Sequence, residues 1–336
     1  MKKRVALIIL ALVLMVFCFA LWKFLGPTVH TPREKFFFVS TGDTYEGVKE
    51  NLNELKIMSG ETWFDWTARM IGYKTVRPGR YEIKKGMSLV NLVRMLKNGA
   101  QTPVNLVITK LRTKESLASK VGNSFECDST QMIRFLNDRD SLKLYGLDSN
   151  TAMAAPMPFT YTIKWNTTPR KIFDHFYAAY KTFWTEERKK KADSLGFSPA
   201  EVSTLASIID EETNSATDKP FVASVYLNRL AKGMPLQADP TLKYAMRNFE
   251  LKRILNGHKN VQSPYNTYAN KGLPPGPICT PALETIDAVL DSPKTDYLYF
   301  VANSTFDGTH VFTTNYAEHM KYARLYQEEL NKRNIK

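Results

Sequence analysis

The chain has 336 residues, with 46 Lys and Arg against 33 Asp and Glu, which gives a formal charge of +13. This length allows two domains with sizeable cores. The excess of basic residues suits polyanionic or membrane-surface neighbours. These residues are spread along the chain without a nucleic-acid motif, which argues against DNA or RNA binding. Three cysteines without metal-ligand spacing and five histidines without an HExxH motif predict no metal site.

The N-terminal segment predicts a membrane anchor. Residues 1–4 read MKKR, and 18 apolar residues follow without interruption as far as Trp22. At 1.5 Å per residue this run spans about 27 Å, which is close to the thickness of a bilayer core. The preceding basic residues predict a cytoplasmic N-terminus at 1–4 and a transmembrane helix at 5–25. A cleaved signal peptide is the alternative, but no small-x-small cleavage site follows, and Phe17 before Cys18 does not suit lipoprotein processing.

Residues 26–102 are predicted to form a linker and a small α/β module. The segment Pro27–Pro32, PTVHTP, predicts a stiff linker. A strand, a tight turn, a Thr or Ser cap and a short amphipathic helix then recur at regular spacing. The copies begin at Phe36, Arg80 and, more weakly, Val104. The middle copy, residues 78–99, resembles a LysM module, which in other proteins binds glycans that contain N-acetylglucosamine. A structural spacer is the alternative interpretation.

Amphipathic patterns predict helices at Asp128–Leu136, Pro169–Trp184 and Glu186–Asp193, of which the last is a solvated basic face. A better-marked helix follows at Ser198–Thr213, SPAEVSTLASIIDEET. Its start combines an N-cap Ser with a Glu three residues later, and these two residues form a capping box. A Pro in the first turn is a further helix-start signal.

Three carboxylates end this helix, and their positions around its axis differ. A rotation of about 100° per residue places Glu212 at roughly 50° from the centre of the apolar face, against roughly 110° for Asp210 and roughly 150° for Glu211. Desolvation at the edge of the buried face would raise the pKa of Glu212 and keep a proton available near neutral pH. The alternative is that all three carboxylates are solvated at a fraying helix end.

The next segments are rich in Asn, Thr, Tyr, Gly and Pro. Asp218 is predicted to cap a helix over Pro220–Lys232. The stretches MPLQADPTLKYA, SPYNTY and GLPPGP follow, and Pro240 in the first of them is expected to fix a loop. These stretches are typical of a rigid cleft that hydrogen-bonds hydroxyl and N-acetyl groups and stacks on sugar rings. Tyr297–Ala302 and His310–Thr313 predict a hairpin, and Asn315 is expected to cap a terminal helix.

The chain resembles the YceG-like family of endolytic murein transglycosylases in five motifs, which read LASIIDEET, VYLNRLAKGMPLQADPT, SPYNTY, GLPPGPI and YLYFVANSTFDGTHVF. The resemblance implies an α+β fold with a transmembrane helix, a LysM-like module and a mixed α/β catalytic domain over residues 103–336. The family's catalytic acid, the second carboxylate of a Glu-x-Glu-Thr pattern, falls on Glu212. Two positions depart from the family: Asp210 replaces the first acid, and Phe159 replaces the acid of a Pro-Asp-Thr segment.

The resemblance implies a lytic reaction that needs no cofactor. Glu212 would protonate the glycosidic oxygen between N-acetylmuramic acid and N-acetylglucosamine, and would then take the proton of the sugar's C6 hydroxyl as this closes onto C1 to form a 1,6-anhydro ring. The candidate substrate-binding residues are Gln237, Asp239, Tyr265, Asn266 and Thr267. Such an enzyme would cut nascent glycan strands internally and limit their length.

The same resemblance implies partners and a location. We expect peptidoglycan strands, the cytoplasmic membrane and cell-wall synthases as partners, and a single-pass protein of the bacterial inner membrane whose catalytic domain lies outside the cytoplasm. One alternative is a hydrolytic muramidase, with Asp239 as a second carboxylate. Another is a non-catalytic peptidoglycan-binding scaffold for the synthases.

Overall fold

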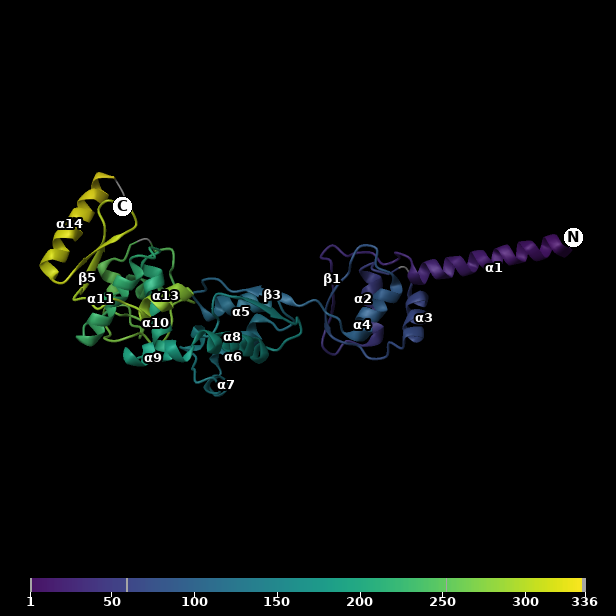
Figure 1. Cartoon of the computed structure of the whole chain (residues 1–336), viewed down its shortest axis with the longest axis horizontal. Coiled ribbons are helices and arrows are strands. Elements are labelled where there is room, and N and C mark those ends of the chain that lie inside the picture. Colours follow the sequence, from purple (N-terminus) through teal and green to yellow (C-terminus); the bar gives the residue numbers. More distant parts are fainter. Residues whose placement is uncertain (1, 59, 252, 334–336) are drawn as a thin grey trace. The chain divides into compact units, whose positions relative to one another are not determined.

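The computed structural model describes residues 2–58, 60–251 and 253–333, and the chain divides into two compact units (Figure 1). Unit 1 takes the chain up to Asn105 together with Ser124–Cys127 and Thr162–Thr168. Unit 2 takes Leu106–Asn123, Asp128–Tyr161 and the chain from Pro169 onward. The predicted boundary at residues 102 and 103 therefore falls close to the first crossing between the units.

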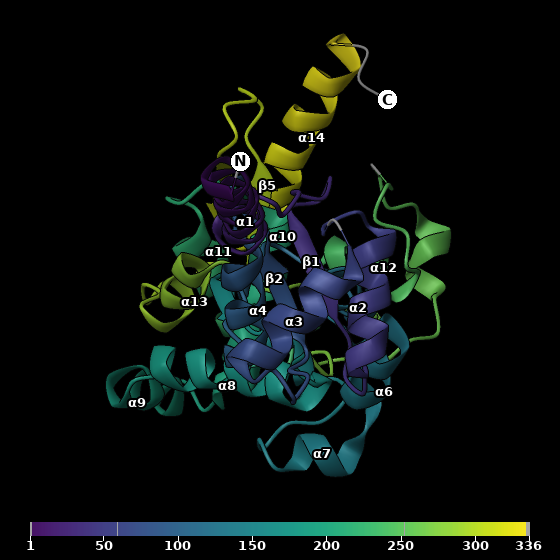
Figure 2. The same ribbon diagram turned by 90° about the vertical axis from the view of Figure 1, so that its right-hand side faces the viewer.

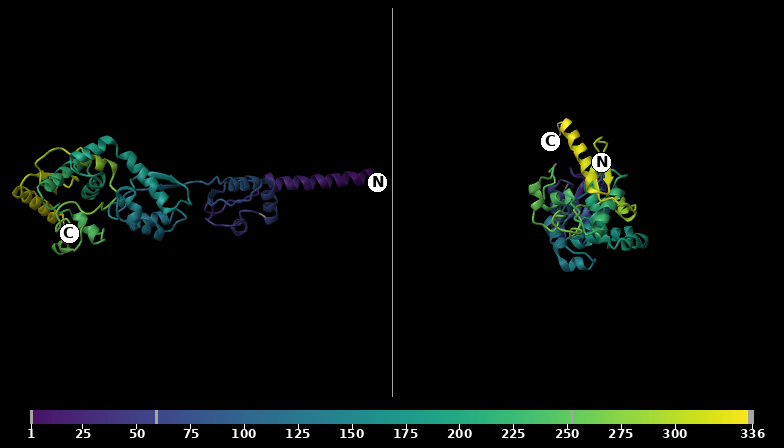
Figure 3. Two further views of the ribbon diagram at one scale, coloured as in Figure 1. Left: turned by 90° about the horizontal axis from the view of Figure 1, so that it is seen from below. Right: turned by 90° about the vertical axis from the view of Figure 1, so that its left-hand side faces the viewer.

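Unit 1 begins with a long apolar helix that continues into a small α/β module. Its elements are α1 (Lys2–Leu25), β1 (Phe36–Val39), α2 (Tyr45–Glu54), α3 (Glu61–Ile71), β2 (Gly79–Glu82) and α4 (Leu89–Asn98). Helix α1 is long and apolar enough to cross a membrane, with a mean hydropathy of 3.1, and it appears as a straight rod in Figure 3. This confirms an N-terminal helix with the length and composition of a single membrane span.

The two clearer sequence copies form one antiparallel ribbon in the module. Phe37 of β1 lies opposite Tyr81 of β2, and both side chains are buried in the module core. Thr44 and Ser88 accept hydrogen bonds from backbone N–H groups in the first turns of α2 and α4, as the repeat predicts. Helices α2, α3 and α4 lie together in Figure 2. Whether this module is a LysM domain stays a prediction.

The segment predicted as a linker is packed onto the module. Val29 is only 4% exposed, and its N–H donates to the carbonyl of Met87. The N–H of His30 donates to the carbonyl of Ile57. The two prolines indicated a stiff segment. Its packing could not be predicted, because backbone hydrogen bonds to distant residues leave no local pattern in the sequence.

Unit 2 is mostly helical around α10. Its elements are β3 (Val104–Val107), α5 (Lys114–Gly122), α6 (Ser129–Asn137), α7 (Arg139–Lys143), η1 (Ala152–Ala154), β4 (Thr160–Ile163), α8 (Pro169–Phe183), α9 (Glu186–Ser194), α10 (Pro199–Glu212), α11 (Lys219–Ala231), α12 (Asp239–Ala245), η2 (Asn256–Asn260), α13 (Leu283–Leu290), β5 (Tyr299–Ala302), β6 (His310–Thr313) and α14 (Tyr316–Lys332). The short strands β3 and β4, which carry the chain between the units, pair with each other, and β5 pairs with β6 as an antiparallel hairpin. Unit 2 therefore has the predicted mixture of helices and small sheets.

Helix α10 is the centre of the core of unit 2. The predicted capping box is confirmed, because Ser198 and Glu201 exchange side-chain to backbone hydrogen bonds. Every residue from Val202 to Asp210 is buried, so the helix is covered on all sides, with α11, α12 and α13 packed against it. Polar side chains on a helix that is buried on all sides need hydrogen-bond partners from other elements.

Two local predictions downstream of α10 were wrong. Asp218 lies at the N-cap position of α11 but makes no capping hydrogen bond, because its carboxylate pairs with His310 at 2.9 Å. The segment around Pro240, predicted as a loop, forms the short helix α12. This proline stands in the first turn, where a backbone N–H would have no partner within the helix, so its absence costs nothing.

Candidate active site

The three consecutive carboxylates at the end of α10 have three different environments. Asp210 is 5% exposed, and its carboxylate accepts hydrogen bonds from Lys219 Nζ at 2.8 Å and Thr285 Oγ1 at 2.7 Å. Lys110 Nζ lies 3.0 Å from its other oxygen. Burial alone would raise the pKa of Asp210, but the bonds from Lys219, Thr285 and Lys110 outweigh it and lower this pKa. Asp210 is therefore an ionised structural anchor.

Glu211 is held by an arginine. Arg112 donates through Nε and Nη2 to both carboxylate oxygens, at 3.2 and 3.0 Å. Lys110 Nζ lies 3.5 Å from the same group. The Glu211 carboxylate is therefore engaged by two cations, Arg112 and Lys110.

Glu212 has no cation in direct contact among the described residues. The Tyr226 hydroxyl, on α11, donates to Glu212 Oε1 at 2.7 Å. Burial raises the pKa of Glu212 to about 7, the Tyr226 bond and Lys243 lower it in part, and the negative charge of Asp239 raises it. The predicted high pKa is therefore present. The helical projection did not anticipate the low exposure of Asp210, which is 5%.

Glu212 opens into a cavity of about 260 Å³. The cavity is lined by side chains from α10, α11, the loop before α12, α12 itself, the loop after η2, β5 and α14. These residues are Glu212, Tyr226, Arg229, Leu236, Gln237, Asp239, Tyr268, Phe300 and His319. Of the sequence-predicted substrate-binding residues, Gln237 and Asp239 thus share a cavity with Glu212.

The backbone of Gln237 is fixed in a sparsely populated conformation. Its φ is 54°, in the left-handed region that side-chain-bearing residues rarely adopt. The Gln237 N–H donates to the carbonyl of Thr267, and Arg229 Nη1 donates to the carbonyl of Leu236 at 2.8 Å. These bonds keep the Gln237 side chain at the cavity, and residues strained in this way often occur at binding sites.

Asp239 is the second carboxylate of this cavity. The Tyr268 hydroxyl donates to Asp239 Oδ1 at 2.6 Å. Each of the two cavity acids thus receives a hydrogen bond from a tyrosine, Glu212 from Tyr226 and Asp239 from Tyr268. The cavity thus holds two acids: Glu212, whose pKa is raised, and Asp239, which accepts a hydrogen bond from Tyr268. Such a pair of acids is typical of sites that transfer protons.

The other three predicted binding residues lie outside the Glu212 cavity. Tyr265 lines a neighbouring cavity. Asn266 is fully buried, and its amide donates to the carbonyls of Lys259 and Val261. Thr267 Oγ1 accepts from the Ala238 N–H. Asn266 shapes the loop that carries Tyr268, and Thr267 joins this loop to the one that carries Gln237. Direct substrate contact by Asn266 and Thr267 stays a prediction.

The sequence reading missed His319 and Tyr226. His319 comes from α14, lines the Glu212 cavity, and its Nδ1 is buried without a hydrogen-bond partner among the described residues. Its ring stacks on Tyr299 with centroids 5.4 Å apart. A buried polar atom without a partner is uncommon in folded proteins, so His319 is a candidate for a role in this cavity. The motif VYLNRLAKG contained Tyr226, but its helical spacing is equally typical of a core residue.

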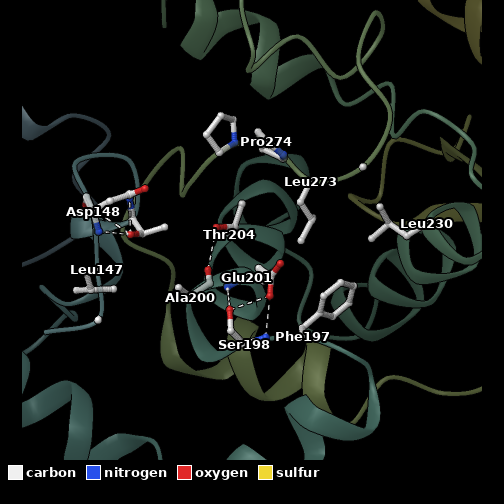
Figure 4. A pocket seen from close by; sticks show the side chains of 14 residues that line it. Leu147, Asp148, Phe197, Ser198, Ala200, Glu201, Thr204, Leu230, Leu273 and Pro274 are labelled. Carbon is white, nitrogen blue, oxygen red and sulfur yellow. Dashed lines mark hydrogen bonds between the residues drawn. The ribbon is translucent and has the colours of Figure 1, made fainter. Parts of the chain in front are cut away.

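A larger cavity, of about 810 Å³, lies at the other end of α10 beside the capping box (Figure 4). Its two acids already accept local bonds: Glu201 from the Ser198 N–H and hydroxyl, and Asp148 from Thr151. Burial raises the pKa of Asp148, but the hydrogen bonds from Thr151 and Asn150 outweigh it and lower this pKa. Both acids are thus engaged in local hydrogen bonds, so size alone does not mark the site.

Comparison with known proteins agrees with this architecture. The sequence profile of the YceG-like family matches residues 37–325. A Bacillus subtilis protein named endolytic murein transglycosylase is 30% identical over 310 residues, which cover 88% of this chain and 85% of the relative. A Streptococcus pneumoniae protein of the same name is 27% identical over 84% of this chain, and the match spans only 56% of that longer relative.

A solved structure supports the fold. The crystal structure of a putative YceG-like protein from Listeria monocytogenes shares 26% sequence identity and a TM-score of 0.58 with this chain, covering 86% of this chain and 99% of the other. The family match spans most of both units described above. The chain belongs to the YceG-like family.

Proposed function

We propose that this protein is an endolytic murein transglycosylase in which Glu212 is the catalytic acid and base. The observation that carries the proposal is the environment of Glu212, the one carboxylate of the DEE run that faces a cavity through a neutral hydrogen-bond partner and has a pKa raised to about 7. The names of the two relatives supply the substrate class.

The proposed reaction uses one acid twice. Protonated Glu212 gives its proton to the glycosidic oxygen between N-acetylmuramic acid and N-acetylglucosamine as the bond breaks. The resulting carboxylate, which accepts from the Tyr226 hydroxyl, then removes the proton from the C6 hydroxyl of the muramic acid. That oxygen closes onto C1 as a 1,6-anhydro ring, Glu212 is protonated again, and no water is consumed. A pKa near the working pH suits both steps.

Two side chains of the cavity are proposed to orient the sugar that reacts. Gln237 presents an amide to the cavity, and the His319 ring lines the same cavity. These groups can hydrogen-bond an N-acetyl group, which helps to stabilise positive charge as it develops at C1. Asp239 is the residue that favours the alternative, a muramidase, because a second carboxylate can activate water.

The N-terminal helix extends the proposal to location. The basic residues at the start of the chain, MKKR, predict a cytoplasmic N-terminus, so the chain that follows α1 would lie outside the cytoplasm at the inner membrane. An anchored enzyme there reaches strands that are still close to the cell-wall synthases, which are its expected partners, and cuts them internally.

The first test is the Glu212→Gln variant with Glu211→Gln as its matched control. We expect Glu212→Gln to lower cleavage of purified peptidoglycan by about 10²- to 10⁴-fold while co-sedimentation with the same material is retained. Glu211→Gln should keep most of the activity. Full activity in Glu212→Gln would contradict the assignment, and absence of cleavage by the wild-type protein would support the scaffold alternative.

A further inference from the structure

A second cavity of unit 2 gathers basic and aromatic side chains. Its volume is about 270 Å³, and its lining includes Lys114, Ser149, Asn150, Tyr244, Arg247 and Tyr265. Pockets that enclose a whole small-molecule ligand measure roughly 300–1,000 Å³. Like the Glu212 cavity, this cavity is therefore large enough for one unit or substituent of a larger molecule, not for the whole molecule.

The second cavity shares its supporting elements with the Glu212 cavity. Helix α12 gives Asp239 to the Glu212 cavity and Tyr244 to the second one. These positions are about 7.5 Å apart along a helix axis, at 1.5 Å per residue. The loop after η2 is divided in the same way, with Tyr268 in the first cavity and Tyr265 in the second. A polymer bound at Glu212 can therefore place a neighbouring unit at the second cavity.

Lys114 brings a partly buried cation to this cavity. Its Nζ donates to Asn137 Oδ1 and to Ser149 Oγ, both at 2.6 Å, and both acceptors are neutral. Burial lowers the pKa of Lys114, and the nearby charge of Arg247 lowers it further, against opposing effects of Glu115 and Asp148. A cation that faces a second cation and has neutral partners is one that an incoming anion would stabilise.

Arg247 supplies the second cation. Its guanidinium lies over the Tyr244 ring, 4.8 Å from the centroid. Among the described residues Arg247 forms one ion pair, to Glu115 at 3.6 Å. The two side chains are 47% and 61% exposed, so this pair contributes little. The planar guanidinium fork suits a carboxylate. The Tyr244 and Tyr265 rings, with centroids 4.6 Å apart, provide an apolar wall beside it.

We propose that this second cavity binds a carboxylate of the stem peptide carried by a muramic acid close to the cleaved bond. The inference rests on the proposed function, because only a murein strand presents such peptides along a glycan. Lys114 and Arg247 pair with the carboxylate, and Tyr265 contacts the aliphatic part of the peptide. The free lactyl group of a peptide-stripped muramic acid offers the same chemistry, and the choice of substrates separates these two sources.

The test measures kcat/KM of the full chain in detergent on two substrates, peptide-bearing glycan strands and strands stripped of peptides by an amidase. We expect Arg247→Gln and Lys114→Gln each to lower kcat/KM about tenfold on peptide-bearing strands and to leave stripped strands unaffected. Glutamine keeps hydrogen-bonding capacity and removes the charge. The exposed Lys271, which lines neither cavity, is the control as Lys271→Gln.

Each remaining outcome decides the question. Equal losses on both substrates, or no loss on either, would overturn the peptide site. A loss confined to stripped strands would assign the cavity to the lactyl carboxylate instead. If the wild-type protein cleaves neither substrate, the proposed function fails, and the peptide site fails with it. Cleavage of both substrates without discrimination by the variants removes the peptide site alone.

Discussion

The Tyr226 hydroxyl donates to Glu212 Oε1 at 2.7 Å, and this bond joins α11 to the end of α10. Tyr226 is 1% exposed, so the donor cannot turn to water without breaking the packing around it. The bond fixes the orientation of the Glu212 carboxylate and offsets part of the rise in pKa that burial produces. Position and proton affinity of the proposed acid are thus set by the same contact.

Tyr226→Phe should raise the pKa of Glu212 above about 7, because it removes a bond that stabilises the carboxylate. Loss of a hydrogen bond to the charged carboxylate should shift the pKa of Glu212 upward by about one unit. Since the protonated acid is the active form, the alkaline limb of the pH profile of kcat/KM should move to higher pH. An unchanged profile would show that Tyr226 does not tune the acid.

Glu212 should also make stability depend on pH. Its pKa is about 7 in the folded protein against an ordinary value of 4.5, so the folded state binds the proton more tightly. Stability should therefore fall as pH rises through this window, and the loss at high pH is at most about 3 kcal/mol. Denaturant unfolding should show that Glu212→Gln gains stability relative to wild type between pH 5 and pH 8. A constant difference would contradict the raised pKa.

The buried pair of Asp210 and Lys219 should be strongly coupled. The side chains of Asp210 and Lys219 are 5% and 9% exposed. Asp210→Ala leaves the Lys219 ammonium buried without its main partner and should cost about 3–5 kcal/mol of unfolding free energy. Adding Lys219→Met to Asp210→Ala should cost much less than the sum of the single changes. Additive losses in denaturant unfolding would contradict the coupling.

Glu211→Gln is the comparison for this pair. Its partner Arg112 is 42% exposed. Glu211 itself is 14% exposed, so only the Arg112 side of this ion pair is open to solvent, and the change should cost about 1 kcal/mol, less than Asp210→Ala.

Gly276 allows a close approach of two backbone segments. A Cβ at this position would lie 2.1 Å from the carbonyl oxygen of Asn150. Gly276→Ala should therefore destabilise the protein by about 1–3 kcal/mol, the usual effect of overpacking. A Cβ at Gly257 would meet nothing within 4 Å, so Gly257→Ala is the control and should be close to neutral. Equal melting temperatures for the two variants would contradict the contact.

The sequence predicted those parts of the protein that local chemistry determines. The capping box at Ser198, the caps at Thr44 and Ser88, and the β5–β6 hairpin depend on neighbouring residues, and all were confirmed. The pKa of Glu212 was also anticipated, because its place near the apolar face of its own helix is a local property.

Contacts between distant segments could not be predicted in this way. The projection of α10 put Asp210 away from the core, yet Lys110 and Thr285 bury it from positions 100 and 75 residues away. His319 reaches the Glu212 cavity from the terminal helix. Side chains such as those of Asn266 and Thr267 occur both in sugar-binding sites and in turns. Only the hydrogen bonds in the structure show that these two side chains hold loops together.

The most direct test of the account is to digest purified peptidoglycan in water enriched in the heavy oxygen isotope and to analyse the new chain ends by mass spectrometry. We predict internal fragments that end in 1,6-anhydro-N-acetylmuramic acid, without heavy oxygen, and their absence with Glu212→Gln. Reducing ends that carry the heavy isotope would contradict the account, because they would show that water, activated at the cavity that Glu212 shares with Asp239, takes the place of the C6 hydroxyl.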